Sequence, residues 1–207
     1  MSQFFSLHPE HPQPRLVRQA ADILRKGGLI AFPTDAAYAL GGLTGDAALL
    51  DRIRRIRDVD ERHLFTLMCR DLSEIATYAR VDNAQYRLLK ATTPGPYTFI
   101  LEGTKELPRR VLHPKRKTIG LRVPDHSLSL ALLEELGEPL LISTLLLPGE
   151  ELPLSDAEDI RERLERQLDL VIECGICGAE MTTVVNLAEG APELVRAGLG
   201  PLPPLGL

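Results

Sequence analysis

Apolar residues recur along this chain with two different periods, and the alternation between them predicts a mixed α/β fold. Residues 14–26 place apolar side chains at helical spacing, with Pro14 at the start and two glycines, Gly27 and Gly28, at the end. The fully apolar run at 29–32 follows at once and is short enough to be a buried strand. A helix followed by a buried strand is therefore the first unit of the expected fold.

Similar patterns continue to the C-terminus. Strands are expected at 65–69, 97–101, 118–123, 140–147, 170–172, 183–187 and 194–196. A helix is expected at 127–136, and four others follow aspartates that can cap them: Asp46, Asp71, Asp82 and Asp156. No linker divides the series. We expect one α/β domain over 1–207 with one large twisted mixed sheet, a core at about 15–198 and an extended, frayed end at 200–207.

Composition narrows the class of protein. The chain has 207 residues, of which 44% are apolar and 26% charged, and these fractions exclude a disordered or fibrous protein. The longest apolar stretch, 139–148, is too short to cross a bilayer. The N-terminus lacks a basic region followed by a long apolar run. We therefore expect a cytoplasmic protein with no membrane partner.

The net charge of −5 conceals an uneven distribution. Residues 1–124 carry 20 basic and 13 acidic residues, whereas 125–207 carry 4 and 16. An acidic chain is a poor candidate for binding nucleic acid, but basic side chains gathered on one face of the first part would still attract anionic ligands. A solvent-exposed helix face explains any single run of charged residues at least as well as a binding site for anions does.

Two of the segments that could carry chemistry lie in the first third of the chain. Residues 33–42 follow a buried strand, where α/β sheets place ligand loops, and Thr34 with nearby backbone N–H groups could hold a carboxylate or phosphate. An ordinary turn fits this segment equally well. Arg54 and Arg57 stand near the end of a helix, where arginine could bind phosphate or merely offset the helix dipole.

Two more segments accompany predicted strands. The Pro-Gly-Pro turn at 94–96 should deliver Thr98 to a fixed place. Strand alternation puts Thr118, Gly120 and Arg122 on one face, where the glycine leaves room for a ligand. A buried arginine is costly when unpaired, so we expect a carboxylate or an anionic ligand beside Arg122.

Cys174 and Cys177 have the spacing of a zinc or redox pair. A structural zinc needs four ligands, and the chain has no second such pair and no suitably spaced histidines. A thioredoxin-like pair would begin a helix, whereas this one follows a predicted strand. Two incidental thiols and no protein-bound metal are expected.

Taken together and in order, these segments resemble the YrdC/YciO family, most closely its YciO branch, over about residues 15–198. The matching sequences are PTDAAYALG from residue 33, the pair Arg55 and Arg57, PGPYTFIL from 94, KTIGLRVPDH from 117, ISTLLLPG from 142, TTVVNL from 182 and LVRAG from 194. The resemblance implies a twisted mixed sheet with a deep, basic concave face.

The resemblance also implies an activity. Characterised members make threonylcarbamoyl-adenylate from L-threonine, bicarbonate and ATP, with Mg²⁺ bound to the ATP, as the first step of a tRNA modification. By resemblance, Thr34, Arg122 and Thr183 would hold threonine. The nucleotide, as ATP or AMP, would contact Arg55, Arg57, Thr118, Thr144 and Arg196, and the first two arginines would also assist the chemical step.

The chain departs from the synthases of this family at several positions, and three of them lie in two short motifs. The synthases carry K-x-R and S-x-N patterns, whereas this chain has Arg55 for the lysine, Thr144 for the serine and Leu146 for the asparagine. A leucine side chain cannot donate a hydrogen bond, so weak or altered synthase activity is expected. The alternative is a non-catalytic module that binds double-stranded RNA or tRNA through the same concave face.

Overall fold

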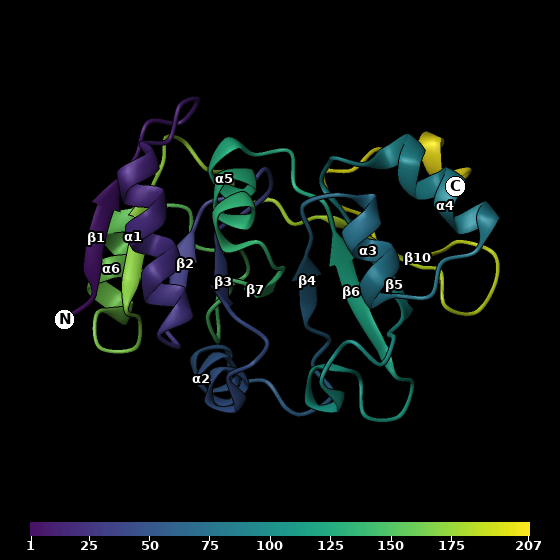
Figure 1. Ribbon diagram of the computed structural model, residues 1–207, viewed down its shortest axis with the longest axis horizontal. Coiled ribbons are helices and arrows are strands. Elements are labelled where there is room, and N and C mark those ends of the chain that lie inside the picture. The colour runs from purple at the N-terminus through teal and green to yellow at the C-terminus, as the bar shows by residue number, and fades with distance from the viewer.

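The computed structural model describes all 207 residues, and one mixed ten-stranded sheet runs through the molecule (Figure 1). The spatial order of its strands is β1-β8-β2-β3-β7-β4-β6-β5-β9-β10. The strands are β1 (Gln3–Ser6), β2 (Ile30–Phe32), β3 (Ala39–Gly42), β4 (Thr66–Met68), β5 (Tyr97–Glu102), β6 (Thr118–Arg122), β7 (Leu140–Thr144), β8 (Leu170–Glu173), β9 (Thr183–Asn186) and β10 (Glu193–Arg196).

Six α-helices and two short 3₁₀ helices flank the sheet. They are α1 (Pro14–Arg25), α2 (Ala47–Arg57), α3 (Leu72–Tyr78), α4 (Asn83–Thr92), α5 (Ser127–Leu136), α6 (Ala157–Leu164), η1 (Arg109–Val111) and η2 (Pro203–Leu205). All four aspartate caps expected from the sequence are confirmed, at α2, α3, α4 and α6. Asp82 makes a complete capping box with Gln85. None of the helices combines the length and apolar character that a membrane crossing requires.

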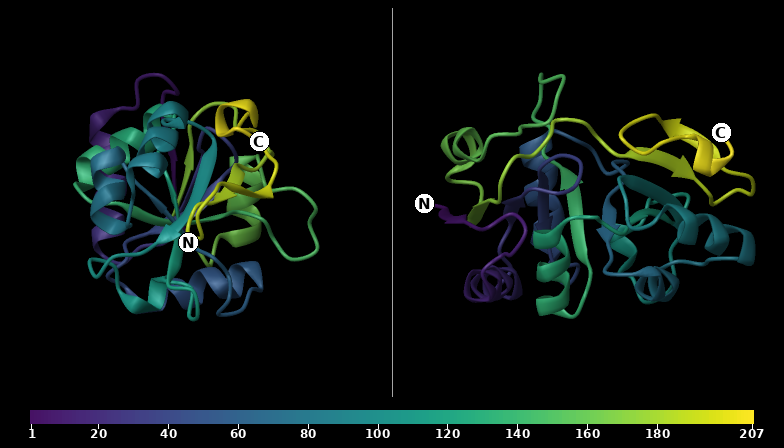
Figure 2. Two further views of the ribbon diagram at one scale, coloured as in Figure 1. Left: turned by 90° about the vertical axis from the view of Figure 1, so that its right-hand side faces the viewer. Right: turned by 90° about the horizontal axis from the view of Figure 1, so that it is seen from above.

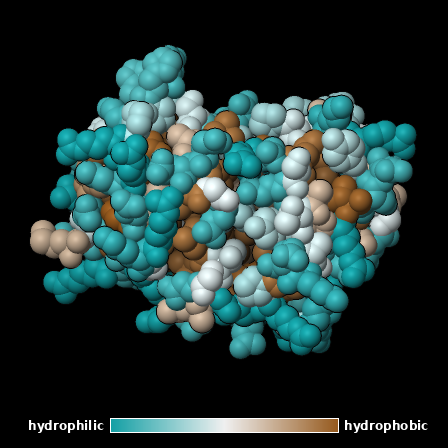
Figure 3. Space-filling model, viewed as in Figure 1, coloured by the Kyte–Doolittle hydropathy of each residue, from teal (hydrophilic) through white to brown (hydrophobic).

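The core divides between the faces of the sheet. Helices α1 and α5 pack together and bury Leu24 and Leu132 against β2, β7 and β8. A larger cluster joins α2, α3, α4 and α6 to β4, β5 and β6. Hydrophilic side chains cover most of the face drawn in Figure 3, and hydrophobic residues show through in patches among them.

Both ends of the chain depart from the sequence-based expectation. β1 lies outside the expected core at about 15–198, yet it pairs in parallel with β8 and forms one edge of the sheet. The C-terminal segment is not frayed, because η2 packs on α4 and Leu205 is buried. Tyr97 Oη also donates a hydrogen bond to the carbonyl of Pro201 at 2.8 Å. Figure 2 shows the C-terminus folded back beside β10.

The loop that begins at residue 33 is shorter than the expected range 33–42. Its last four residues form β3, which pairs antiparallel with β2 through Ala31 and Leu40. Only residues 33–38 connect the two strands. The loop therefore turns the chain within the sheet and does not lead into a helix.

Candidate functional site

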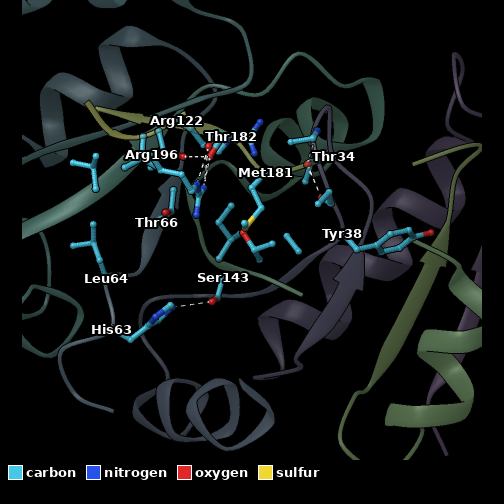
Figure 4. A pocket seen from close by; sticks show the side chains of 18 of the residues that line it. Thr34, Tyr38, His63, Leu64, Thr66, Arg122, Ser143, Met181, Thr182 and Arg196 are labelled. Carbon is cyan, nitrogen blue, oxygen red and sulfur yellow. Dashed lines mark hydrogen bonds between the residues drawn. The ribbon is translucent and has the colours of Figure 1, made fainter. Parts of the chain in front are cut away.

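A cavity of about 460 Å³ lies where β3 and β7 meet β4, β5 and β6, with β9 and β10 on its other side (Figure 4). Its volume is in the range of sites for small molecules. Six threonine and serine side chains line it, along with three arginines and one histidine: Thr34, Thr66, Thr98, Ser143, Thr144, Thr182, Arg57, Arg122, Arg196 and His63. No aspartate or glutamate lines the cavity.

Arg57 is the last residue of α2, and its guanidinium is held without a carboxylate. Its Nε donates to the carbonyl of Leu146 at 3.2 Å, and its Nη1 donates to Ser143 Oγ at 2.7 Å. Burial lowers the pKa of Arg57, and the nearby charge of Arg196 lowers it further. Two cations that repel each other in one cavity favour an anionic ligand between them.

Arg196 approaches the cavity from β10. Its Nε and Nη2 donate to the carbonyl of Thr182 at 3.2 Å and 2.9 Å, and no acidic side chain pairs with it. Thr182 in turn shares a hydrogen bond with Thr98, Oγ1 to Oγ1, at 2.9 Å. In Figure 4 the Arg196 side chain points at Thr182 beside the open cavity. This wall therefore presents a second positive charge on a fixed support.

Arg122 is the one cavity arginine in an ion pair. It donates to the carboxylate of Asp35, which follows Thr34 in the 33–38 loop. The sequence-based expectation of a carboxylate or anionic ligand beside this arginine is met by Asp35. The Nε of Arg122 is nevertheless buried without a hydrogen-bond partner.

Thr34 lines the cavity while it holds its own turn. Its hydroxyl donates to the carbonyl of Ala37 at 2.7 Å and accepts from the N–H of Ala36 at 3.1 Å.

The two cysteines of the C-terminal part contact backbone carbonyls. Cys177 Sγ approaches the carbonyls of Thr34 and Ala36, while Cys174 Sγ approaches that of His8. Burial raises the pKa of both thiols. No group of three or more potential metal-ligating side chains is present in the molecule.

Of the eight expected site residues, the structure brings five together: Thr34, Arg57, Arg122, Thr144 and Arg196. Arg55 is not among them. It stands two residues before Arg57 on α2, and residues two apart project from different sides of a helix. Arg55 is exposed and borders a shallow surface depression with Arg54 and Asp58.

Thr118 and Thr183 also lie outside the cavity. Thr118 shares a face with Arg122, but four residues along a strand separate them by roughly 13 Å. Thr183 is completely buried, and its hydroxyl donates to the carbonyl of Gly200 and accepts from the N–H of Gly198. Its neighbours Thr182 and Val184 line the cavity, so strand alternation turns Thr183 the other way.

Gly120 leaves room for two side chains of the protein, whereas the sequence-based expectation was room for a ligand. The space above it holds the side chains of Thr66 and Thr98, and an added Cβ would approach Thr66 Oγ1 to 2.8 Å. Because Gly120 has no side chain, these two threonines can lie close to the strand and line the cavity.

Sequence reasoning missed His63, Ser143, Thr66 and Thr182 as lining residues. His63 lies in the loop between α2 and β4, inside a charged stretch that resembles ordinary surface. Ser143 lies in an apolar strand, where the one available signal was a polar residue inside a hydrophobic run. Only the pairing of β7 with β3 and β4 brings Ser143 towards the end of α2.

Comparison with known proteins identifies the family of the chain. The sequence profile of the family described as "Sua5_yciO_yrdC: Telomere recombination" matches residues 22–198. The chain belongs to the Sua5/YciO/YrdC family. It is 55% identical over 204 residues to YciO of Escherichia coli, an uncharacterized protein, and the match covers 99% of each chain. The crystal structure of E. coli YciO superimposes with a TM-score of 0.96 and covers 99% of this chain and 100% of that one.

Family members with a named activity are more distant. A threonylcarbamoyl-AMP synthase of Pyrococcus abyssi is 30% identical over 190 residues, which are 90% of this chain and 55% of that protein. The crystal structure of P. abyssi Sua5 complexed with L-threonine gives a TM-score of 0.87 at 24% identity, covering 95% of this chain and 58% of that one. This likeness shows a shared fold.

Proposed function

We propose that the cavity binds ATP beside L-threonine and that the chain slowly forms threonylcarbamoyl-AMP from ATP, L-threonine and bicarbonate, releasing pyrophosphate. The observation that carries the proposal is the pair Arg57 and Arg196, two cations in a cavity lined by hydroxyl groups and free of carboxylates. Similarity to a threonylcarbamoyl-AMP synthase over most of this chain supports the choice of reaction.

The reaction needs positioned substrates and no protein nucleophile. The threonine amine combines with bicarbonate to give a carbamate and water. A carbamate oxygen then bonds to the α-phosphorus of ATP, and the bond from that phosphorus to the bridging oxygen breaks, so pyrophosphate leaves. Negative charge grows on the leaving group, where Arg57 and Arg196 would stabilise it together with Thr144.

The amino-acid end of the cavity would be the one formed by Thr34 and Arg122. Arg122 lines this end, its positive charge suits a carboxylate, and Asp35 holds the guanidinium in place. Mg²⁺ would enter with ATP and stay on phosphate oxygens and water, because no carboxylate of the chain lines the cavity. We expect low turnover, since Leu146 offers only a backbone carbonyl near Arg57 where synthases carry an asparagine.

Isothermal titration of the purified chain with ATP, with and without L-threonine, tests this function. We expect saturable ATP binding that tightens when threonine is present, because the two ligands would share one cavity. RNA binding that weakens with salt, in a protein that binds no ATP, would instead support the non-catalytic RNA-binding module.

A further inference from the structure

The guanidinium of Arg57 uses only part of its hydrogen-bonding capacity within the protein. It has five N–H donors. Nε donates to Leu146 O, Nη1 donates to Ser143 Oγ and lies 3.3 Å from His63 Nε2, and Nη2 makes no hydrogen bond. A side chain held through Nε and Nη1, with Nη2 left over, has a fixed plane and an edge available for a ligand.

The direction of each hydrogen bond among Arg57, Ser143 and His63 can be assigned. Arginine only donates, and Arg57 Nη1 lies against both Ser143 Oγ and His63 Nε2, so both atoms are assigned as acceptors towards Arg57. Ser143 then directs its own proton to His63 Nε2, 3.0 Å away. That nitrogen must then carry a lone pair, and the hydrogen-bond pattern assigns the proton of the neutral ring to Nδ1. In Figure 4 the His63 ring points at Ser143 across the lower edge of the cavity.

The surroundings of His63 keep its ring neutral and fixed. Its edge meets the ring of Phe65 at a centroid distance of 5.1 Å and an angle of 86°. Burial lowers the pKa of His63 to about 4, helped by the charges of Arg57 and Arg54 and opposed by Asp60. The acceptor that Ser143 needs is therefore present at neutral pH.

We infer that His63 is a positioning residue: by accepting from Ser143, it holds Arg57 in the orientation that presents Nη2 to the phosphates of the nucleotide. The inference rests on the proposed function and adds to it the residue that completes the anion site. Within the pattern Arg55-x-Arg57, only Arg57 faces the cavity. His63, from the loop beyond α2, is the second side chain on Ser143.

The same contact could suggest a serine nucleophile with a histidine base. A base with a pKa of about 4 has little driving force to remove a serine proton at neutral pH. Arg57 also donates to one of the two lone pairs of Ser143 Oγ, which lowers the nucleophilicity of that oxygen. The geometry favours orientation of Arg57 over covalent catalysis.

Three variants separate positioning from packing. His63→Phe keeps a ring against Phe65 and removes the acceptor, whereas His63→Gln keeps an acceptor near the position of Nε2. His11→Phe is the control, since His11 is exposed near the N-terminus. Binding of ATP and of inorganic tripolyphosphate is measured by titration calorimetry for each variant, and for both His63 variants combined with Arg57→Ala.

We expect His63→Phe to weaken binding of both probes about tenfold, the effect of one hydrogen bond in a charged network. His63→Gln should recover most of that loss, and His11→Phe should have no effect. In the Arg57→Ala background, His63→Phe should cause no further loss of affinity for either probe, because its effect depends on Arg57. An equal loss in that background would show direct contact with the ligand and overturn the inference, as would full binding by a folded His63→Phe protein.

A second readout does not depend on any ligand. The pKa of His63 is measured by NMR titration of its ring, in the parent chain and in Arg57→Ala. We expect an upward shift in the variant, because one of the two nearby cations has been removed. Absence of ATP and tripolyphosphate binding together with this shift would refute the proposed function but leave the His63–Arg57 contact standing. An unchanged pKa would refute the contact itself.

Discussion

Arg122 and Asp35 form the one ion pair of this fold in which both side chains are buried, with 4% and 9% of their surfaces exposed. The pair joins β6 to the loop between β2 and β3, and Asp35 also accepts a hydrogen bond from the backbone N–H of Asp125. A buried charge needs its partner far more than an exposed one does. The contact therefore stabilises the cavity wall as well as orienting the arginine.

Asp35→Asn should destabilise the protein by about 3–5 kcal/mol, because it leaves the buried charge of Arg122 without a counter-charge. Urea denaturation measures the free energy of unfolding. Asp22→Asn is the control, since Asp22 pairs with Arg25 on the surface and its loss should cost less than about 1 kcal/mol. Equal effects of the two variants would contradict a structural role for the buried pair.

Thr183→Val should lower the free energy of unfolding by roughly 1–3 kcal/mol, because the buried carbonyl of Gly200 and the N–H of Gly198 would lose their partner. ATP and threonine binding should stay unchanged, since Thr183 faces away from the cavity. Chemical denaturation and calorimetry on the same samples check both expectations. Weaker threonine binding at unchanged stability would restore the role that the family resemblance implied.

Arg57→Ala and Arg55→Ala form a matched pair on one helix. Arg57→Ala should weaken ATP binding by roughly 1–3 kcal/mol, because it removes charge-assisted hydrogen bonds to phosphate. Arg55→Ala should leave ATP affinity unchanged, since Arg55 is exposed outside the cavity. Calorimetric titration of both proteins gives the comparison, and a larger loss from Arg55→Ala would show that the binding site lies elsewhere.

Stability should fall in mild acid because of His63. The pKa of this ring is lowered from 6.5 to about 4 in the folded protein, so the unfolded chain binds a proton that the folded one excludes. The free energy of unfolding keeps its full value above pH 6.5 and declines as the pH falls towards 4. The decline caused by His63 amounts to about 2 kcal/mol between pH 7 and pH 5.

The check is the free energy of unfolding across this range, compared with His63→Gln. The parent should show the steeper decline, since glutamine does not titrate. Parallel curves for the two proteins would mean that the folded protein does not lower the pKa of His63.

Local features of the fold were readable from the sequence. The side chains of Asp46 and Asp82 cap α2 and α4 as expected, because capping depends on residues two or three positions away. β1 was missed because its partner β8 lies far along the chain, and its short run carries no strong alternation. The C-terminal segment is ordered by contacts with α4 and Tyr97, which its prolines do not reveal.

The candidate site was predicted less completely, for reasons of geometry. Helical phase separates Arg55 from Arg57, and strand alternation separates Thr183 from Thr182. Both corrections follow from rules that apply to the sequence itself. His63 and Ser143 are different, because only the packing of the loop before β4 against β7 joins them.

Pyrophosphate release tests the central claim most directly. The purified chain is given saturating ATP with threonine and bicarbonate, then with each omitted in turn, and Arg57→Ala is run alongside. We predict slow release that requires both threonine and bicarbonate and that falls about 100- to 1000-fold in the variant, the range for loss of one preorganised donor in an active site. Release at the same rate without threonine, or none at all from a protein shown to bind ATP, would contradict the account.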